Sequence, residues 1–399
     1  MTPSTVGNFG YYYSSKDLTM SKIKHVLGIS GGKDSAALAI YLRNKHPDLD
    51  ITYYYCDTGK ELDETYRLIE NLESYLGKNI QKLKSDEANK KGDNPFDYYY
   101  KIYRGYLPST AARWCTKNMK LKPFENFVGS TPTISYVGIR GDEDREGYIS
   151  TKPNIQSIFP FRRNIWSEGL IRKLLANENI GMVEDLYHQQ LSGRELDLVL
   201  KIVRQPLEFE YQNHRHNNRL IKEKLEKLLD KGVIPFNKVV FNFIKNTDYP
   251  LAKEEYFPLL ENDEVLKKED IFQTLEDSGV GIPEYYQKME FEVDGKKGFY
   301  NRSRSGCFFC FFQQKIEWVW LLEQHPDLYE KAMKYENEDE GFTWNADMET
   351  LKELKQPKRL EQIKRNFLKK QEQQNIKKQS NKLIDILEDE NAGCPACFI

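Results

Sequence analysis

Residues 25–42 read H-V-L-G-I-S-G-G-K-D-S-A-A-L-A-I-Y-L, and this stretch decides the fold. The short apolar run 25–29 predicts a strand, and the alanine-rich run 36–42 predicts a helix. Between them a glycine pair allows a sharp turn that exposes backbone N–H groups, and the start of the helix adds a partial positive charge. The stretch therefore predicts a strand, an anion-binding loop and a helix, in that order.

The side chains of residues 30–35, which we call the phosphate loop, suit the same ligand. Ser30 and Ser35 supply hydroxyl donors and Lys33 supplies a cation. The loop follows neither the G-x-x-x-x-G-K-[ST] pattern nor the G-x-G-x-x-G pattern, so P-loop kinases, GTPases and dinucleotide folds are disfavoured. We expect an exposed loop whose substitution leaves stability nearly unchanged.

The next segments repeat the strand-then-helix rhythm. Strands are predicted at 51–56, 81–85 and 133–139, and a helix at 64–76. Strands that alternate with helices predict an α/β fold with a doubly wound parallel sheet. Ligands of such sheets bind at the carboxyl ends of the strands, where the phosphate loop and the residues after Cys56 and Ile139 fall.

The remainder of the chain divides by composition. The segment 163–248 predicts helices, including one over 218–231 with apolar residues at helical spacing. Another helix is predicted from Asp270 to Gly279, and the chain after Cys310 is predicted to be helical to its end. The expected organisation is a flexible arm at 1–20, a split α/β domain at 21–162 and 249–315, a helical insertion at 163–248, and a helical C-terminal region at 316–399 with a basic stretch and a C-x-x-C tail.

Composition narrows the class of protein. The 399 residues are 39% hydrophobic and 30% charged with a formal net charge of −2, so a packed core is expected and any nucleic-acid contact must be local. No run of about 18 apolar residues and no export signal is present, so no membrane contact and a cytoplasmic location are expected. The two C-x-x-C pairs among the six cysteines indicate metal or redox chemistry.

Three motifs carry a family resemblance. The phosphate loop resembles the S-G-G-x-D-S loop of the ATP pyrophosphatase superfamily, which has a HUP-like fold. The run D-T-G-K-E-L-D-E-T at 57–65 resembles a run of the phosphoadenosine-phosphosulfate (PAPS) reductase branch of that superfamily, and so does G-I-R-G-D-E at 138–143. The resemblance spans roughly 22–160 and 265–315.

The resemblance implies a site for ATP with Mg²⁺. Asp57 would accept a hydrogen bond from adenine or ribose, and Arg140 would clamp a phosphate. Glu64 and Glu143 could belong to the site or to solvated helix faces. The implied nucleotide-binding residues are Ser30, Gly31, Gly32, Lys33, Asp34, Ser35, Asp57, Gly59, Glu61, Gly138 and Arg140, with Lys33, Asp34 and Ser35 in catalysis.

The cysteine motifs indicate one group of proteins within this branch. R-W-C-T-K-N-M-K-L-K-P at 113–123 and G-C-F-F-C at 306–310 are similar to DNA-phosphorothioation sulfurtransferase subunits of the DndC and SspD type, and they depart from the C-C run of adenylyl-sulfate reductases. This resemblance implies a 4Fe-4S cluster, for which thiolates are suitable ligands. Its ligands would be Cys115, Cys307 and Cys310, and the fourth iron would be free for Cys394, Cys397 or an exogenous sulfide. Zinc held by Cys307, Cys310, Cys394 and Cys397 is the alternative. Cys56, in a predicted buried strand, is expected to be an apolar filler.

The implied activity is adenylation of a substrate, with release of pyrophosphate, followed by sulfur insertion. The substrate would be the DNA backbone or RNA, the sulfur would come from a cysteine desulfurase, and other phosphorothioation or defence subunits would be partners. Alternatives are tRNA thiolation, PAPS or adenylyl-sulfate reduction, and a nucleotide-binding scaffold of a defence complex. Homo-oligomerisation stays open.

Two basic segments are candidates for nucleic-acid contact. They are Lys352 to Lys382 and the trio Lys117, Lys120 and Lys122 beside Cys115. The alternative for the first segment is a solvated helix, or one that docks on an acidic partner.

Overall fold

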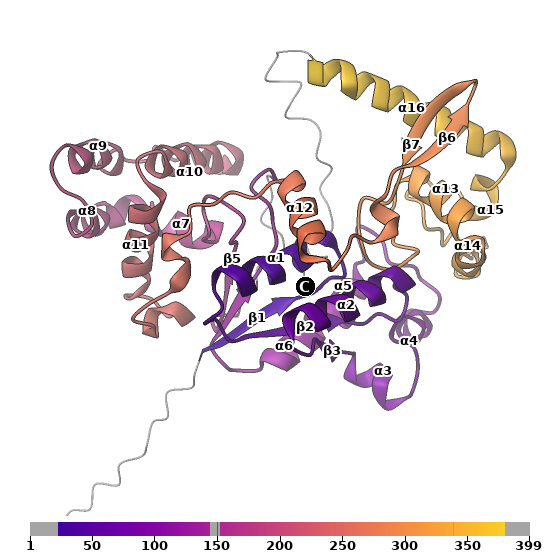
Figure 1. Ribbon diagram of the computed structural model, residues 1–399, viewed down its shortest axis with the longest axis horizontal. Coiled ribbons are helices and arrows are strands. Elements are labelled where there is room, and N and C mark those ends of the chain that lie inside the picture. The colour runs from indigo at the N-terminus through magenta and orange to yellow at the C-terminus, as the bar shows by residue number, and fades with distance from the viewer. Residues whose placement is uncertain (1–22, 144–149, 151, 338, 380–399) are drawn as a thin grey trace, which may run out of the picture.

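A central parallel sheet organises the molecule. The structure, a computed structural model, describes residues 23–143, 150, 152–337 and 339–379. Its sheet has the order β3-β2-β1-β4-β5, and every neighbouring pair in it is parallel (Figure 1). The strands are β1 (Lys24–Gly28), β2 (Ile51–Cys56), β3 (Gln81–Leu83), β4 (Thr133–Tyr136) and β5 (Ile155–Ile158). The predicted doubly wound α/β fold is confirmed, while β5 is an addition that the sequence pattern did not indicate.

Side chains alternate between the two faces of this sheet. Leu27 packs in the largest apolar core with α1 (Lys33–Lys45) and α2 (Asp63–Leu76), while its neighbour Val26 packs on the opposite face with Phe124 of α6 (Lys122–Val128). Successive strand residues point to opposite faces, so apolar strands of this kind need helices on both sides.

Helix α1 is the most deeply enclosed helix in this part of the fold. Every residue from Lys33 to Leu42 is buried, because α12 (Lys268–Ser278) packs along the side of α1 away from the sheet. Small residues such as Ala36 and Ala39 let both neighbours approach closely. The helix predicted from Asp270 is therefore confirmed, and it holds the first turn of α1 in place.

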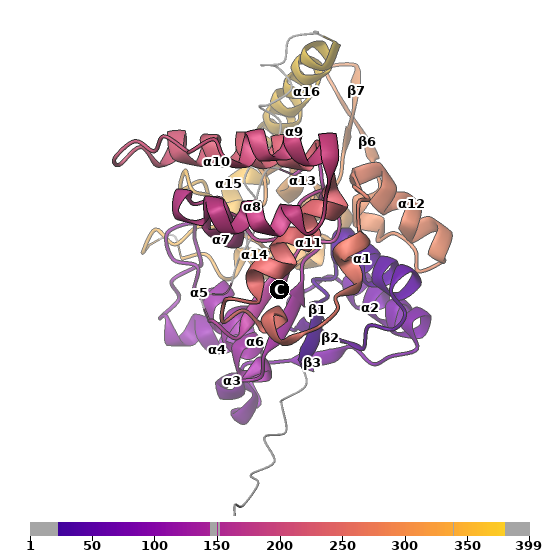
Figure 2. The same ribbon diagram turned by 90° about the vertical axis from the view of Figure 1, so that its left-hand side faces the viewer.

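The segment between β5 and α12 is helical, as expected. Its helices form a lobe to one side of the sheet (Figure 1), which faces the viewer in Figure 2. Their buried residues, such as Phe236, belong to the same continuous core as α1. The helices are α7 (Glu168–Leu174), α8 (Ile180–His188), α9 (Gly193–Val203), α10 (His214–Leu229) and α11 (Val233–Ile244), with 3-10 turns at Asn177–Asn179, Pro250–Lys253 and Pro258–Glu261.

The C-terminal region has a core of its own, on the other side of the sheet. Phe309, Trp318 and Trp344 pack there against Phe96 and Trp114 from the first half of the chain. The first half contributes α3 (Asp86–Lys90), α4 (Pro95–Ile102), α5 (Trp114–Thr116) and a π-helical turn at Lys117–Leu121. The later elements are a 3-10 turn at Glu284–Tyr286, the antiparallel hairpin of β6 (Met289–Val293) and β7 (Lys296–Tyr300), and helices α13 (Lys315–Gln324), α14 (Pro326–Met333), α15 (Leu351–Leu354) and α16 (Pro357–Gln379).

The predicted helical C-terminal region is confirmed, but the chain after Cys310 is not helical throughout. Between α14 and α15 the chain forms irregular structure that includes an isolated bridge from Asn337 to Phe342 and a left-handed Gly341. Burial of Trp344 against the aromatic core stabilises this segment in place of helical hydrogen bonds. The predicted arm at 1–20 and the C-x-x-C tail lie outside the described residues.

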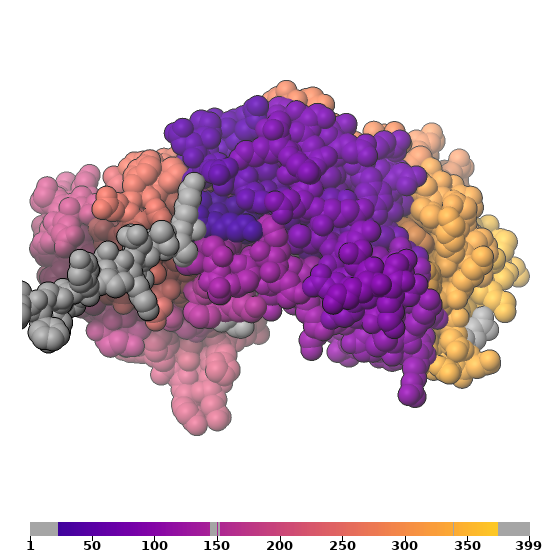
Figure 3. All heavy atoms as spheres, turned by 90° about the horizontal axis from the view of Figure 1, so that it is seen from below, coloured from indigo at the N-terminus to yellow at the C-terminus, as the bar shows by residue number. Residues whose placement is uncertain are grey.

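The three regions present a continuous surface. Seen from below, atoms of the first half of the chain lie between the helical lobe and the C-terminal region (Figure 3). Among the described residues, no helix combines the length and apolar character needed to cross a lipid bilayer.

Candidate active site

The phosphate loop closes on itself through its serines. The Ser30 N–H donates to Ser35 Oγ at 3.1 Å, Ser35 Oγ donates to the Gly32 carbonyl at 3.1 Å, and the Gly32 N–H lies 3.3 Å from Ser30 Oγ. Gly31 has a φ of +72°, and a Cβ on it would lie 2.2 Å from a methyl group of Thr65. Only glycine fits this position, because the absence of a side chain permits both the left-handed turn and the close approach to α2.

The loop is buried, which corrects the expectation of an exposed loop. Lys33, Asp34 and Ser35 are only 7%, 8% and 2% exposed. Two tyrosines from far along the chain cover the loop: the Tyr285 hydroxyl donates to the Gly31 carbonyl at 2.8 Å, and the Lys33 N–H donates to the Tyr286 hydroxyl at 3.4 Å. Substitutions in the loop will therefore affect folding as well as chemistry.

Asp34 links the loop after β1 to the loop after β4. Its carboxylate contacts Arg140 at 3.0 Å and Lys33 at 3.1 Å, and Arg140 also pairs with Asp142 at 2.8 Å and with Glu143 at 2.6 Å. Arg140 is only 5% exposed. Its guanidinium is thus held in place by three carboxylates.

The main chains of the two loops also touch. A Cβ on Gly138 would lie 2.8 Å from the Asp34 carbonyl oxygen. Strands β1 and β4 are adjacent, and the order of the sheet reverses between them. Ligands of open α/β sheets bind at this point, so the predicted residues Ser30–Ser35, Gly138 and Arg140 come together where a nucleotide is expected.

Glu64 and Glu143 do not lie on solvated helix faces. They are 8% and 6% exposed, and Glu64 lies 3.8 Å from the imidazole of His325. Of the two alternatives left open by the sequence, the solvated face is therefore wrong for both residues.

Asp57 is held at the carboxyl end of β2 by three donors. It accepts hydrogen bonds from the Gly59 N–H at 2.9 Å and the Tyr66 hydroxyl at 3.0 Å, and it pairs with Lys82 at 2.8 Å. Burial alone would raise the pKa of Asp57, but these donors outweigh it and hold the pKa below its ordinary value. Asp57 is therefore an ionised acceptor at neutral pH.

Glu61 connects this loop to the C-x-x-C turn. Thr58 Oγ1 donates to Glu61 at 2.5 Å and lies 3.1 Å from Cys307 Sγ. An isolated antiparallel bridge joins Glu61 to Cys307, and the Phe308 N–H donates to the Lys60 carbonyl at 2.8 Å. Burial raises the pKa of Glu61, and burial together with the charge of Glu61 raises the pKa of the Cys307 thiol.

The described cysteines are not gathered into a metal site. Cys307 and Cys310 share one turn, in which the Cys310 N–H donates to the Cys307 carbonyl at 3.2 Å, and both Cys115 and Cys307 pack on the aromatic core. Thiolate is the right donor for iron or zinc. Within the described ranges, however, no three His, Cys, Asp or Glu residues gather closely enough to hold a metal ion. Cys394 and Cys397 lie outside those ranges.

Cys56 behaves as a filler, as predicted. Its thiol is 8% exposed and donates to the Lys120 carbonyl at 3.6 Å. Burial raises the pKa of the thiol to about 12, so it is neutral and unreactive at physiological pH.

The two basic segments differ in their surroundings. Lys117 and Lys122 are exposed and Lys120 is half-buried. On and before α16, several cations pair with acids of the chain itself, so part of the charge of that segment is neutralised within the protein. These pairs are Lys355 with Glu330, Arg359 with Glu349, Lys364 with Glu323 and Arg365 with Asp294.

Three site residues were missed by sequence reasoning. Tyr285 and Tyr286 cover the phosphate loop, and Lys268 begins α12 close to it: burial, with the charges of Lys33 and Arg140, lowers the pKa of Lys268. Their distance along the chain hid them. The Pro283-Glu284-Tyr285-Tyr286 run was the available signal, since proline and paired aromatics mark a rigid packing turn.

Comparisons with known proteins agree with this geometry. Residues 24–193 match the family described as the phosphoadenosine phosphosulfate reductase domain. Over 157 residues the chain is 31% identical to an uncharacterized protein of Methanocaldococcus jannaschii, in an alignment that covers 35% of this chain and 30% of that protein. The chain thus spans less than a third of that relative's length. The family match supports the PAPS reductase branch of the ATP pyrophosphatase superfamily, a group of enzymes that act on nucleotides in sulfur chemistry.

Proposed function

We propose that the protein is an ATP-dependent sulfurtransferase that adenylates its substrate, releases pyrophosphate and inserts sulfur, with the DNA backbone as the substrate. The observation that carries the nucleotide part is the contact of the phosphate loop with Gly138 and Arg140 at the point where the order of the sheet reverses. The observation that supports the sulfur part is the bridge between the loop after β2 and Cys307.

The charge of each residue in the site determines its proposed role. Loop N–H groups, Lys33 and Lys268 would face the β- and γ-phosphates, where negative charge builds up as pyrophosphate leaves. Mg²⁺ bound with the nucleotide would neutralise further charge there. Asp34 keeps Lys33 and Arg140 in position, and the ionised Asp57 would accept a hydrogen bond from adenine or ribose.

The sulfur side of the proposal rests on the cysteines. Cys115, Cys307 and Cys310 would bind a 4Fe-4S cluster, with Cys394 or Cys397 as a possible fourth ligand. The alternative is zinc bound by Cys307, Cys310, Cys394 and Cys397. A cysteine desulfurase would supply sulfur, and other phosphorothioation or defence subunits would be partners. These proposals follow from the resemblance of the cysteine motifs and from the soft-donor chemistry of thiolates. The same chemistry would serve tRNA thiolation.

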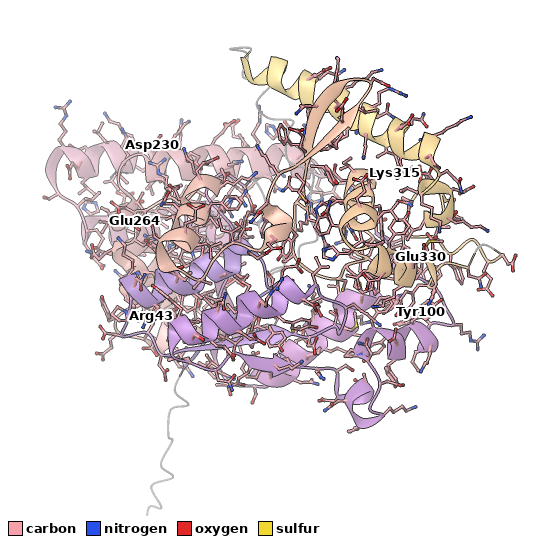
Figure 4. All side chains as sticks on the ribbon, turned by 45° about the vertical axis from the view of Figure 1, so that its right-hand side comes forward. Arg43, Tyr100, Asp230, Glu264, Lys315 and Glu330 are labelled. Carbon is pink, nitrogen blue, oxygen red and sulfur yellow. The ribbon has the colours of Figure 1, made fainter. Side chains whose placement is uncertain are left out.

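The experiment that tests the nucleotide part is ATP-dependent release of pyrophosphate by the full-length chain with candidate oligonucleotides. Asp34→Asn keeps the shape of the side chain but removes the charge between Lys33 and Arg140, so we expect at least a tenfold lower rate, in line with the loss of a group that organises a phosphate site. Arg43→Lys, an exposed change on the same helix (labelled in Figure 4), is the matched control and should keep the wild-type rate. Equal rates for all three proteins would refute the assignment of the loop.

A second candidate function is reduction of PAPS or adenylyl sulfate, which the family match favours. Sulfite production from either compound in the presence of a dithiol reductant, without any nucleic acid, would establish it. Sulfite formation without pyrophosphate release from ATP would replace the sulfurtransferase proposal.

A further inference from the structure

A cavity of about 510 Å³ lies in the helical lobe, beside the loop that follows β4. Helices α7 and α10 form two of its walls, and Gly141 with Val265 closes it toward the sheet. Its lining joins apolar and basic side chains. We call the buried and half-buried apolar residues the floor and the half-buried and exposed basic residues the rim. The floor is Ile171, Ile221 and Leu225, and the rim is Arg162, Arg163, Arg172, Arg219 and Lys222, with the acids Glu168 and Glu226 also in the lining.

Part of this positive charge is already neutralised. Arg163 pairs with Asp230 at 2.7 Å and with Glu226 at 3.5 Å, and Arg219 lies 3.8 Å from Glu223. Asp230 is seen at the end of α10 in Figure 4. These ion pairs hold side chains of the rim in place, and the paired arginines contribute no net positive charge.

Two arginines of the rim, Arg162 and Arg172, make contacts other than ion pairs. Arg172 donates to the amide oxygen of Asn218 at 3.0 Å, and the Arg162 guanidinium lies 5.9 Å from the centre of the Phe159 ring. Within the part of the chain that the structure describes, neither has a carboxylate oxygen within 4.0 Å. Two planar guanidinium groups beside an apolar floor are suited to phosphate groups that flank a sugar or base.

The cavity shares a wall with the active site. The Gly141 N–H donates to the Leu266 carbonyl at 2.9 Å, and a Cβ on Gly141 would lie 2.2 Å from a methyl group of Val265. The preceding residue is Arg140, whose side chain contacts Asp34. The lining of the cavity therefore includes the residue that directly follows Arg140, which contacts the phosphate loop.

We propose that this cavity binds the phosphate groups of a single-stranded nucleic acid and leads the strand to the phosphate loop. The proposal deepens the proposed function and rests on it for the identity of the substrate. The apolar floor takes a base or sugar, while Arg162 and Arg172 hold the phosphates on either side.

The test measures binding of a fluorescein-labelled 20-nucleotide single strand to the full-length protein by anisotropy, between 50 and 200 mM salt, a range over which nucleic-acid affinity depends strongly on counterion release. Arg162→Gln combined with Arg172→Gln should weaken binding at least tenfold and reduce the slope of log affinity against log salt by about 1.4, as expected for two lost contacts to a single strand. Arg194→Gln combined with Lys201→Gln removes the same charge from α9, outside the cavity, and should change binding less than twofold.

Two further arms distinguish the outcomes. Arg162→Lys with Arg172→Lys keeps the charge and should recover most of the affinity, whereas equal weakening by both double variants would indicate a structural defect. Displacement of the strand by millimolar ATP in the wild type, with loss of ATP binding in the glutamine variant, would make the cavity a nucleotide site and overturn the proposal. So would unchanged strand binding by the glutamine variant. Because binding is measured without turnover, absence of pyrophosphate release with strand binding intact would count against the proposed function alone.

Discussion

Gly138 shows at the scale of one residue how closely the two active-site loops are packed. The main chain of Asp34 occupies the space that a side chain at Gly138 would need. Gly138 does not have a positive φ, so glycine is not needed here for an unusual backbone conformation. It is needed because there is no room for a side chain.

We predict that Gly138→Ala separates the loops after β1 and β4. A methyl group 2.8 Å from the Asp34 carbonyl must push one main chain away, and overpacking of this kind costs about 1–3 kcal/mol. Thermal unfolding and calorimetric titration with ATP would measure lower stability together with weaker binding. Gly181→Ala, in α8 with open space around the added atom, is the control and should be neutral or stabilising.

Asp57 makes a second residue-scale prediction, which concerns pH. Its pKa is held below the ordinary value with help from Lys82, so its contribution to stability is present above the unfolded pKa of about 3.9 and is lost as the pH falls through the lower folded value. Lys82→Met should therefore lower stability at neutral pH by about 1 kcal/mol or less, since the lysine is partly exposed and solvent screens the pair.

The difference in unfolding temperature between wild type and Lys82→Met should shrink below about pH 4, where Asp57 is protonated in the unfolded chain. Lys84→Met is a graded control, because Lys84 lies 3.9 Å from Asp57 where Lys82 lies at 2.8 Å. A difference that stayed constant from pH 7 to pH 3 would show that Lys82 acts through packing alone.

At the scale of elements, the sequence predicted the strands and helices that are determined by local residue patterns. Strands β1, β2 and β4 and helices α1 and α2 follow from apolar runs and alanine-rich runs, and the loops after the strands follow from their glycines. Strand β5 was missed because its sequence is Ile-Gln-Ser-Ile, in which Gln156 and Ser157 are buried without an apolar pattern. Its place is set by pairing with β4.

The hairpin of β6 and β7 was missed although its signal was present. Asp294 and Gly295 have φ values of +52° and +70°, which is the left-handed pair of a two-residue hairpin turn. An Asp-Gly pair between alternating apolar residues could have predicted it. The run from Pro283 to Tyr286 indicated a packing turn, but its position over the phosphate loop could not be predicted, because the contacts join residues some 250 positions apart along the chain.

At the scale of elements, we predict the effect of replacing Phe309 on stability. Phe309 is 1% exposed, lies between Cys307 and Cys310 in sequence, and packs against Phe96 at 4.5 Å and Trp344 at 4.8 Å between ring centres. Phe309→Ala should cost about 3–5 kcal/mol, as large-to-small changes in aromatic cores do. Denaturant unfolding measures this cost. Phe299→Ala, at a ring that is 46% exposed on β7, should cost little, and equal effects would show that the C-x-x-C turn is not anchored by the aromatic core.

At the scale of the whole molecule, the regions on either side of the sheet meet the active site from opposite directions. The helical lobe shares its core with α1, and the C-terminal region shares its core with α4 and Trp114. The net charge of −2 does not show where the charges lie. Arg359, Lys364 and Arg365 of α16 pair with acids of the C-terminal region, whereas Arg162 and Arg172 on the rim of the cavity have no carboxylate oxygen within 4.0 Å among the described residues. A strand would thus enter from one side and sulfur from the other.

The proposed cluster tests whether the two halves of the chain are joined by a metal. Cys115 belongs to the first half, while Cys307 and Cys310 share a turn in the second. Protein purified without oxygen should contain iron and acid-labile sulfide, with about four irons per chain for a 4Fe-4S cluster. Each of Cys115→Ser, Cys307→Ser and Cys310→Ser should lose most of that iron, because thiolates are the ligands that hold it.

Cys56→Ala removes a buried thiol that the cluster does not need, so its iron content should equal that of the wild type. Metal that joins distant segments stabilises only the folded state, so the iron-loaded protein should unfold at a higher temperature than the same protein after chelation. Cys56→Ala should keep this difference, and the three serine variants should lose it. Stoichiometric zinc with no sulfide would replace the cluster by a structural zinc site, and iron that survives in Cys115→Ser would confine the metal to the second half of the chain.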